Sequence, residues 1–352
     1  MDGHIRDVYV EADNHVFLVL TDWPTLYQLG RDPTTHQWTV LHGVNLTSSN
    51  DYYRIYGDFA RSEGWVFINR GSGIQRFSKT DLRNTSFVSY PSEGLMIAFD
   101  TQRHLAFGVQ QEDNFVYIFN VETMSLVSTF DYALGGPWPS WQSDTPGGWA
   151  IAADSSRSLL YIGVDCDSPT PANIWQFDYS NLNTPRLTNW VTFGADQCFE
   201  EGFVNPVDGR AWFYEDHAGW AGGFGVQDLN FGRDWTIPSG LYVESLEFDA
   251  ATNTGFFITN GQSDYNTPGQ VFRTCLLETG ISATHEWINW STISDSIGGS
   301  HWDAANHTLY TIGYWSGEVT TITVGATTDC SQAPTSVASV GTSLAGVGRS
   351  IM

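Results

Sequence analysis

The sequence is poor in basic residues and lacks long apolar runs. Of its 15 basic residues only Lys79 is a lysine, against 39 acidic residues, so the net charge at pH 7 is −24. Such a surface repels nucleic-acid phosphates and anionic membranes, which argues against nucleic-acid binding. No run of about 18 apolar residues occurs, so we expect no membrane insertion.

Several signals of targeting and catalysis are also missing. Residues 1–20 contain no basic segment followed by an apolar one, so a signal peptide is not present in this sequence. The motifs Gly-x-Ser-x-Gly, His-Glu-x-x-His and Cys-x-x-Cys do not occur, which argues against a nucleophile elbow, a zincin site and a zinc ribbon. No long stretch combines helical periodicity with caps, so the chain is expected to be all-β.

What is present is a repeat. Its clearest copy has apolar segments at 96–100, 105–109, 116–121 and 126–130, with Asp100 ending the first. The same order occurs six more times, in units of roughly 40–50 residues, the spacing of four-stranded propeller blades. Because one such sheet cannot cover both of its faces, the sequence predicts a seven-bladed β-propeller of four-stranded antiparallel blades.

The repeat also sets the expected domain bounds. We expect one domain over residues 1–341, and a flexible C-terminal tail over 342–352. The last strand is expected at 335–340, and each blade's Asp is expected to accept amides of the first hairpin turn. The expected blades are 5–44, 52–90, 94–131, 148–193, 201–237, 241–288 and 297–341.

Between residue 5 and about residue 325, this pattern resembles the broad propeller superfamily that includes YVTN, NHL and gluconolactonase-like proteins. The resemblance implies the fold. In the gluconolactonase-like members a Glu and Asn or Asp residues of the channel hold a metal, and Glu201, Asn205 and Asp208 resemble that set. The Asn-Asp pairs expected in other blades are missing from this sequence.

Propeller topology assigns each loop to a face. Loops between second and third strands, and linkers between blades, open on one face, which we call the top; the other turns open on the bottom. The longest segments belong to the top face, and long loops on a rigid scaffold commonly carry function. They are 131–148, 165–173, 194–202, 215–223, 260–270 and 289–299.

These top segments combine aromatic and acidic residues, with few bases. Aromatic faces stack on sugar rings, and carboxylates accept hydrogen bonds from sugar hydroxyls. Packing of the tryptophans onto the propeller is the alternative interpretation. The candidate ligand-binding residues are Trp138, Trp141, Trp149, Trp220, Tyr265, Glu215 and Asp216.

Two further sites are suggested by acids. Asp216 and His217 are adjacent and are candidates for a carboxylate-oriented base, although a solvated polar loop is the preferred interpretation. An acid lies near the entry to every blade, and Glu200, Glu201 and Glu244 are candidates to hold Ca²⁺ at the mouth of a central channel. In so acidic a chain this spacing also arises by chance.

The four cysteines fall in two spatially reasonable pairs. We predict disulfides Cys166–Cys198 and Cys275–Cys330, which favours an oxidising, extracellular location; four unpaired thiols are the alternative. Four N-x-S/T sequons permit N-glycosylation and are compatible with secretion. They begin at Asn45, Asn84, Asn289 and Asn306.

These observations leave three functions open. The first is a secreted binding module that recognises a glycan or protein through its top face. The second is a Ca²⁺-dependent hydrolase or lactonase with its site in the channel. The third is a structural subunit of an extracellular assembly. The absence of a complete catalytic set favours binding, and the sequence sets no oligomeric state.

Overall fold

The computed structural model describes most of the repeat region. The described residues are 5–10, 16–21, 25–31, 34, 38–46, 55–56, 65–70, 73–90, 95–110, 113–133, 147–164, 171–195, 199–205, 209–215, 220–224, 231–236, 241–261, 269–275, 285–289, 297–313, 319–325 and 334–340.

The described residues form seven four-stranded antiparallel sheets, each a meander in which consecutive strands pair. The strands are, sheet by sheet, β1 (Ile5–Val10), β2 (Val16–Thr21), β3 (Thr25–Arg31) and β4 (Trp38–Asn45); β5 (Ile55–Tyr56), β6 (Trp65–Arg70), β7 (Gly73–Ser78) and β8 (Thr85–Ser89); β9 (Leu95–Asp100), β10 (Leu105–Gln110), β11 (Phe115–Asn120) and β12 (Ser125–Asp131); β13 (Gly148–Asp154), β14 (Leu159–Val164), β15 (Pro171–Asp178) and β16 (Arg186–Ala195); β17 (Phe199–Val204), β18 (Ala211–Glu215), β19 (Trp220–Phe224) and β20 (Phe231–Thr236); β21 (Leu241–Asp249), β22 (Thr254–Gly261), β23 (Gln270–Cys275) and β24 (His285–Asn289); β25 (Ile297–Asp303), β26 (Thr308–Gly313), β27 (Val319–Thr323) and β28 (Ser336–Val340).

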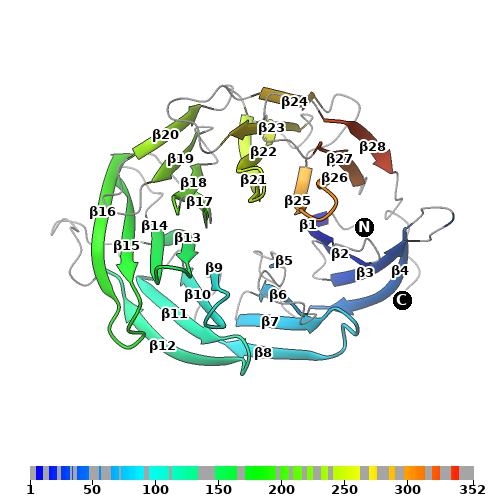
Figure 1. Ribbon diagram of the computed structural model, residues 1–352. Coiled ribbons are helices and arrows are strands. Elements are labelled where there is room, and N and C mark those ends of the chain that lie inside the picture. The colour runs from blue at the N-terminus through cyan, green and yellow to red at the C-terminus, as the bar shows by residue number, and fades with distance from the viewer. Residues whose placement is uncertain are drawn as a thin grey trace.

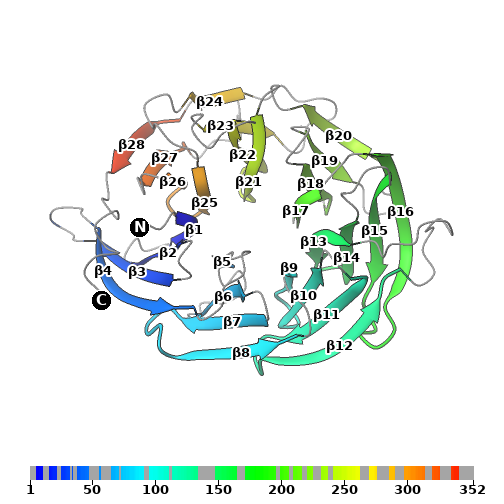
Figure 2. The same ribbon diagram turned by 180° about the vertical axis from the view of Figure 1, so that it is seen from behind.

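The sheets stand side by side around a ring, with the first strand of each sheet innermost and the fourth outermost (Figures 1 and 2). Inner strand β1 contacts both β5 and β25, and β13 contacts both β9 and β17. The protein is therefore an all-β propeller with four-stranded antiparallel blades, as the repeat predicts. No helix long and apolar enough to cross a membrane occurs among the described residues.

Burial follows from this arrangement. Strands β10 and β26 are buried along their whole length, because neighbouring sheets cover both of their faces. Every residue of the outer strand β12 is exposed or partly exposed. Apolar residues on both faces of the second strands therefore hold the ring together, since burying a large apolar side chain contributes about 1.5–3 kcal/mol.

The aspartates that end the inner strands cap the turns that follow, as expected. Asp100 Oδ1 accepts the N–H groups of Gln102 and Arg103 at 2.9 and 3.0 Å. Asp154, Asp249 and Asp303 make the equivalent contacts with the residues that follow them. Four residues after each Asp the backbone is left-handed, and the residues concerned are His104, Ser158, Asn253 and His307.

The fifth sheet departs from two expectations. Its inner strand is followed by Asn205, whose backbone N–H donates to the Arg210 carbonyl and whose carbonyl accepts the Gly209 N–H, both at 2.8 Å. Asn205, and not Asp208, therefore stands at the position that Asp100 has in the third sheet. Asp208 itself lies outside the described residues. The apolar pattern predicts the third strand at 224–227. The structure has it at Trp220–Phe224, because β18 and β19 pair from Ala211↔Phe224 to Glu215↔Trp220. In the last sheet, β28 confirms the strand expected at 335–340.

Five inner strands share a β-bulge near the top face, where the chain enters the sheet. The register against the second strand shifts at one residue in each case. A bulge adds an unpaired residue and re-aims the side chains next to it. The bulge residues are Arg6, Trp149, Glu200, Glu244 and Gly298.

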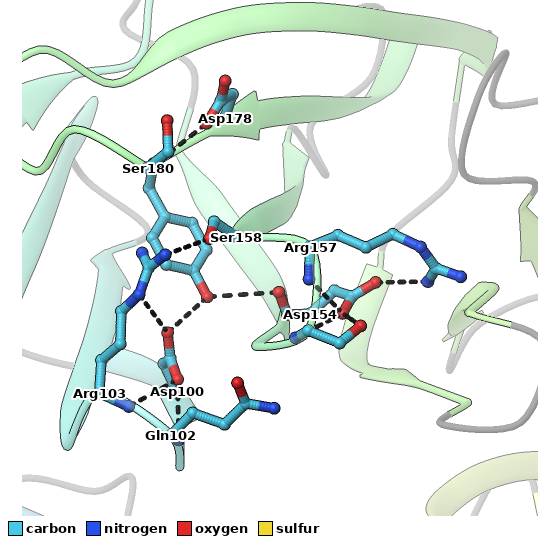
Figure 3. A network of polar contacts seen from close by, with 10 residues as sticks. Asp100, Gln102, Arg103, Asp154, Arg157, Ser158, Asp178 and Ser180 are labelled. Atoms are coloured by element: carbon cyan, nitrogen blue, oxygen red, sulfur yellow. Dashed lines mark hydrogen bonds and ion pairs between the residues drawn. The ribbon is translucent and has the colours of Figure 1, made fainter.

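On the bottom face, polar contacts join the third sheet to the fourth (Figure 3). The buried Tyr179 donates its hydroxyl to Asp100 Oδ2 at 2.9 Å, and the Arg103 guanidinium lies 5.4 Å from the Tyr179 ring centroid and donates to Ser158 Oγ. In the next seam, Arg157 lies against Gly209, whose φ is +73° and where an added Cβ would meet Arg157 Nη1 at 1.8 Å.

The Asp100–Tyr179 contact gives a stability prediction. Tyr179→Phe leaves a fully buried carboxylate without its tyrosine donor, and we expect the free energy of unfolding to fall by about 1–3 kcal/mol. The matched control is Tyr117→Phe, which removes a hydroxyl bonded to the partly exposed Asp113, where water can replace it. Urea denaturation of the two variants tests this, and equal losses would contradict it.

Candidate functional site

The bulged ends of the inner strands in the fifth, sixth and seventh sheets carry a polar network at the top face. Tyr214 donates its hydroxyl to Glu201 Oε2 at 3.0 Å and lies 3.3 Å from the Glu244 carbonyl. Asn260 Nδ2 donates to Glu244 Oε2 at 3.0 Å, while its Oδ1 accepts the Ile297 N–H at 2.8 Å. Two partly exposed carboxylates are therefore held in place by buried tyrosine and asparagine side chains.

Deeper in the same strands, two sheets depart from the pattern of the others. The third residue after the bulge is Tyr9, Ala152 or Phe203 in three sheets, but Glu247 in the sixth sheet and His301 in the seventh. Titratable groups enclosed by protein are costly, so their placement here needs a compensating role or compensating contacts.

Glu247 receives its contacts from the neighbouring strand β25. Its Oε1 lies 3.0 Å from Ser300 Oγ, and its Oε2 accepts the Trp302 N–H at 3.2 Å. The pKa of Glu247 is raised to about 8. Burial is the main cause and the negative charges of Glu201 and Asp7 add to it, whereas the bonds from Ser300 and Trp302 oppose the rise. Glu247 is therefore mostly a neutral acid at pH 7.

His301 belongs to a second group, on the seventh, first and second sheets. Its ring lies 4.7 Å from the Tyr9 ring, and Lys79 Nζ donates to the Tyr9 hydroxyl at 2.9 Å. The pKa of His301 is lowered to about 4. Burial is the main cause and the Lys79 charge adds to it, although a hydrogen bond to the Val10 backbone opposes the shift. The only lysine of the chain thus stands beside a neutral histidine.

The arrangement does not support a metal centre in the described part of the chain. No group of three or more His, Cys, Asp or Glu side chains gathers there as metal ligands would. Glu201 lies at the top of β17 and Asn205 just beyond its bottom end, about 13 Å apart along an extended strand, and Asn205 Nδ2 bonds Asn253 at 2.6 Å. Glu201 and Asn205 therefore do not share one ion, which corrects the gluconolactonase-like expectation.

The candidate ligand residues lie mostly where the structure gives no description. Trp138, Trp141, Asp216, His217 and Tyr265 lie outside the described residues.

Four other candidates are placed by their backbone. Trp149 is the bulge residue of inner strand β13, so it does not belong to a top loop. Glu215 and Trp220 face each other across β18 and β19, next to Tyr214, and therefore lie at strand ends rather than inside a long loop. Glu200 is the bulge residue beside Glu201.

Only some of the cysteines and asparagines of the predicted disulfides and glycosylation sites belong to the described residues. Cys166, Cys198 and Cys330 lie outside the described residues, and Cys275 is the last residue of β23. Asn289 is the last residue of the outer strand β24. Asn45, Asn84 and Asn306 are exposed, but Asn306 donates to Asp303 Oδ2 at 2.7 Å and so takes part in a turn cap.

The sequence reasoning missed Glu247, His301 and the serines beside them. A signal existed. Glu247 and His301 each stand two residues before a capping aspartate, Asp249 or Asp303, where the third and fourth units have alanine. Aligning the units on the capping residue would have shown the two titratable exceptions.

No family model matches the sequence, and no curated protein matches it. Among solved structures, the crystal structure of the Cps50 (Swd1) β-propeller domain from Myceliophteria thermophila is similar, with a TM-score of 0.64 and 12% sequence identity. The match covers 90% of this chain and 96% of that one. At this identity the likeness shows the fold alone, a β-propeller.

The raised pKa of Glu247 gives a pH prediction. Between pH 4.5 and about 8 the folded protein holds a proton on Glu247 that the unfolded chain releases, so the wild type loses stability as pH rises through this range. Glu247→Gln removes this dependence. We expect it to be close to the wild type at pH 5 and more stable at pH 9.

Thermal unfolding at a series of pH values measures the effect, and Glu122→Gln on the exposed surface is the control. A stability difference between Glu247→Gln and the wild type that stays constant from pH 5 to pH 9 would show that Glu247 ionises normally in the folded protein.

Proposed function

We propose that the seven sheets are the seven blades of one closed propeller, and that the protein is a secreted binding module. Its ligand, a glycan or a protein with the glycan preferred, binds at the top face over the fifth to seventh sheets. The main support is the hydrogen-bond network of Glu201, Tyr214, Glu244 and Asn260, which holds carboxylate acceptors in place at the mouth of the ring.

The chemistry of this face supports a neutral polar ligand. Fixed carboxylates accept hydrogen bonds from sugar hydroxyls without a new ordering cost, because Tyr214 and Asn260 already hold them. Trp220 and Glu215 end the strands next to Tyr214, so an aromatic residue and an acid belong to the same edge. A phosphate-bearing ligand fits badly, because uncompensated carboxylates repel it.

The binding test uses a glycan array followed by titration with the best glycan. Trp220→Ala is expected to weaken binding roughly fivefold, since aromatic stacking contributes on the order of 1 kcal/mol per ring. Trp190→Ala, which removes an exposed tryptophan from outer strand β16, is the matched control and should bind as the wild type does.

Binding through one such site is expected to be weak, so the array should present its glycans multivalently. Equal binding by both tryptophan variants, with unchanged melting temperatures, would remove the proposed site from the top face. Loss of folding in Trp220→Ala without a separate binding effect would favour the structural alternative.

Secretion is the second part of the proposal, and it rests on the cysteines. We expect Cys166–Cys198 and Cys275–Cys330, each joining neighbouring sheets and each contributing roughly 2–4 kcal/mol. Peptide mapping under non-reducing conditions should recover both linked peptide pairs from protein purified from a culture medium. Recovery of four free thiols would overturn the disulfides and the extracellular location together.

A structural subunit of an assembly is the second candidate, and exposed apolar residues on outer strands favour it. Leu126 and Val127 on β12 and Trp190 on β16 each expose more than two fifths of their surface. Such residues on a sheet edge suit contact with another chain. If this role holds, Trp190→Ala should weaken self-association or partner binding and leave glycan binding unchanged.

A further inference from the structure

The buried hydroxyl of Ser300 lies between two hydrogen-bond partners, Ser245 and Glu247. It is 7% exposed, and its Oγ lies 2.7 Å from Ser245 Oγ and 3.0 Å from Glu247 Oε1. A hydroxyl carries one hydrogen, so Ser300 donates to one of these partners and accepts from the other. The other oxygen of Glu247 is engaged by the Trp302 N–H, so a proton on this carboxyl group belongs on Oε1.

The hydrogen bonds that link Ser245, Ser300 and Glu247 form a chain, which can run in either of two directions. When Glu247 is a carboxylate, Ser300 donates to it, Ser245 donates to Ser300, and Ser245 has only lone pairs left to offer. When Glu247 is protonated, it donates to Ser300, Ser300 donates to Ser245, and the Ser245 hydrogen is left for a ligand. Ser245 is partly exposed, and among the described residues it has no hydrogen-bond partner other than Ser300.

The charged and titratable groups around Glu247 decide whether it is protonated, and so which direction the hydrogen bonds take. Glu201 on β17 and Asp7 on β1 act on it with negative charge. Glu244 lies on its own strand β21, the hydroxyl of Tyr214 lies beside Glu244 and Glu201, and His301 follows Ser300 on β25. With its pKa raised to about 8, Glu247 is mainly protonated at pH 7, and Ser245 then presents a donor.

We propose that Ser245 is a subsite for the acetamido carbonyl of an N-acetylated sugar, and that the Ser300–Glu247 chain sets whether Ser245 donates or accepts. The proposal rests on the proposed function, whose glycan ligand it specifies. A sugar hydroxyl bonds Ser245 in either direction, because it both donates and accepts. A carbonyl oxygen only accepts, so it requires the direction in which Glu247 is protonated, and being neutral it tolerates Glu201 and Asp7.

The test compares two disaccharide probes, di-N-acetylchitobiose and cellobiose, by calorimetric titration at pH 6.5 and pH 9.5. For the wild type, di-N-acetylchitobiose should bind roughly fivefold to tenfold more weakly at pH 9.5, as expected for the loss of one hydrogen bond. Cellobiose, which has no acetamido group, should show no such change. Glu122→Gln is the surface control and should behave as the wild type does.

Two variants distinguish an effect of the hydrogen-bond chain from a general effect of pH on binding. In Glu247→Gln the amide N–H₂ replaces the acid as donor to Ser300, so binding of di-N-acetylchitobiose should stay at its pH 6.5 strength at both pH values. Ser300→Ala cuts the chain, so the pH dependence should disappear. Infrared spectra of ligand-free protein give an independent readout. The carboxylic acid band of Glu247 should disappear as pH rises through about 8, and its frequency should shift in Ser300→Ala.

The outcomes distinguish this proposal from the proposed function. Equal affinity for di-N-acetylchitobiose at both pH values in the wild type overturns the subsite, even if glycans bind. Failure of di-N-acetylchitobiose to bind, while other glycans bind in a Trp220-dependent manner, also overturns the subsite and leaves the proposed function standing. Failure of every glycan on the array to bind overturns both.

Discussion

Each four-stranded sheet of this protein must bury both of its faces against neighbouring sheets, and the rest of the structure depends on this constraint. It explains why second strands such as β10 and β26 are buried throughout, whereas the outer strand β12 is exposed or partly exposed at every residue. It also fixes the inner strands around one axis, so that single residues from different sheets come together there.

The two faces of the ring differ in the contacts that their side chains make. At the bottom, capping residues and cross-sheet contacts repeat from one sheet to the next: Asp100 with Tyr179, Arg157 with Gly209, and Asn205 with Asn253. At the top, the bulges release the first residues of the inner strands from the regular ladder. The bottom contacts thus join neighbouring sheets, and the top face is where the proposed ligand site lies.

Much of the fold was predictable because its signals are local. The apolar alternation, the turn aspartates such as Asp100 and the position of β28 each depend on residues that are close together in the sequence. The apolar pattern misplaces the third strand of the fifth sheet because Gly222 and Gly223 carry little strand propensity, and pairing with β18 decides the register instead. In the fifth sheet Asn205 stands where other sheets have a capping Asp, and its backbone closes the turn through Gly209 and Arg210.

The site was harder to predict, because it depends on contacts between sheets. Glu201 and Glu244 were found as acids near the entry to a blade, but Tyr214 and Asn260, which hold them, are recognisable only once the strands are paired. Ser245, Ser300 and Glu247 stand on two strands about 55 residues apart, and only the packing of the sixth sheet against the seventh brings them together.

The central claim is that the top ends of the fifth to seventh sheets bind the ligand. Hydrogen–deuterium exchange with and without the best glycan from an array tests it most directly, because it reports on every backbone amide at once. The account predicts slower exchange at the β18–β19 strand ends, at Glu244 and Ser245, and at the start of β25. Protection confined to the bottom turns or to outer strands β12 and β16 would contradict it.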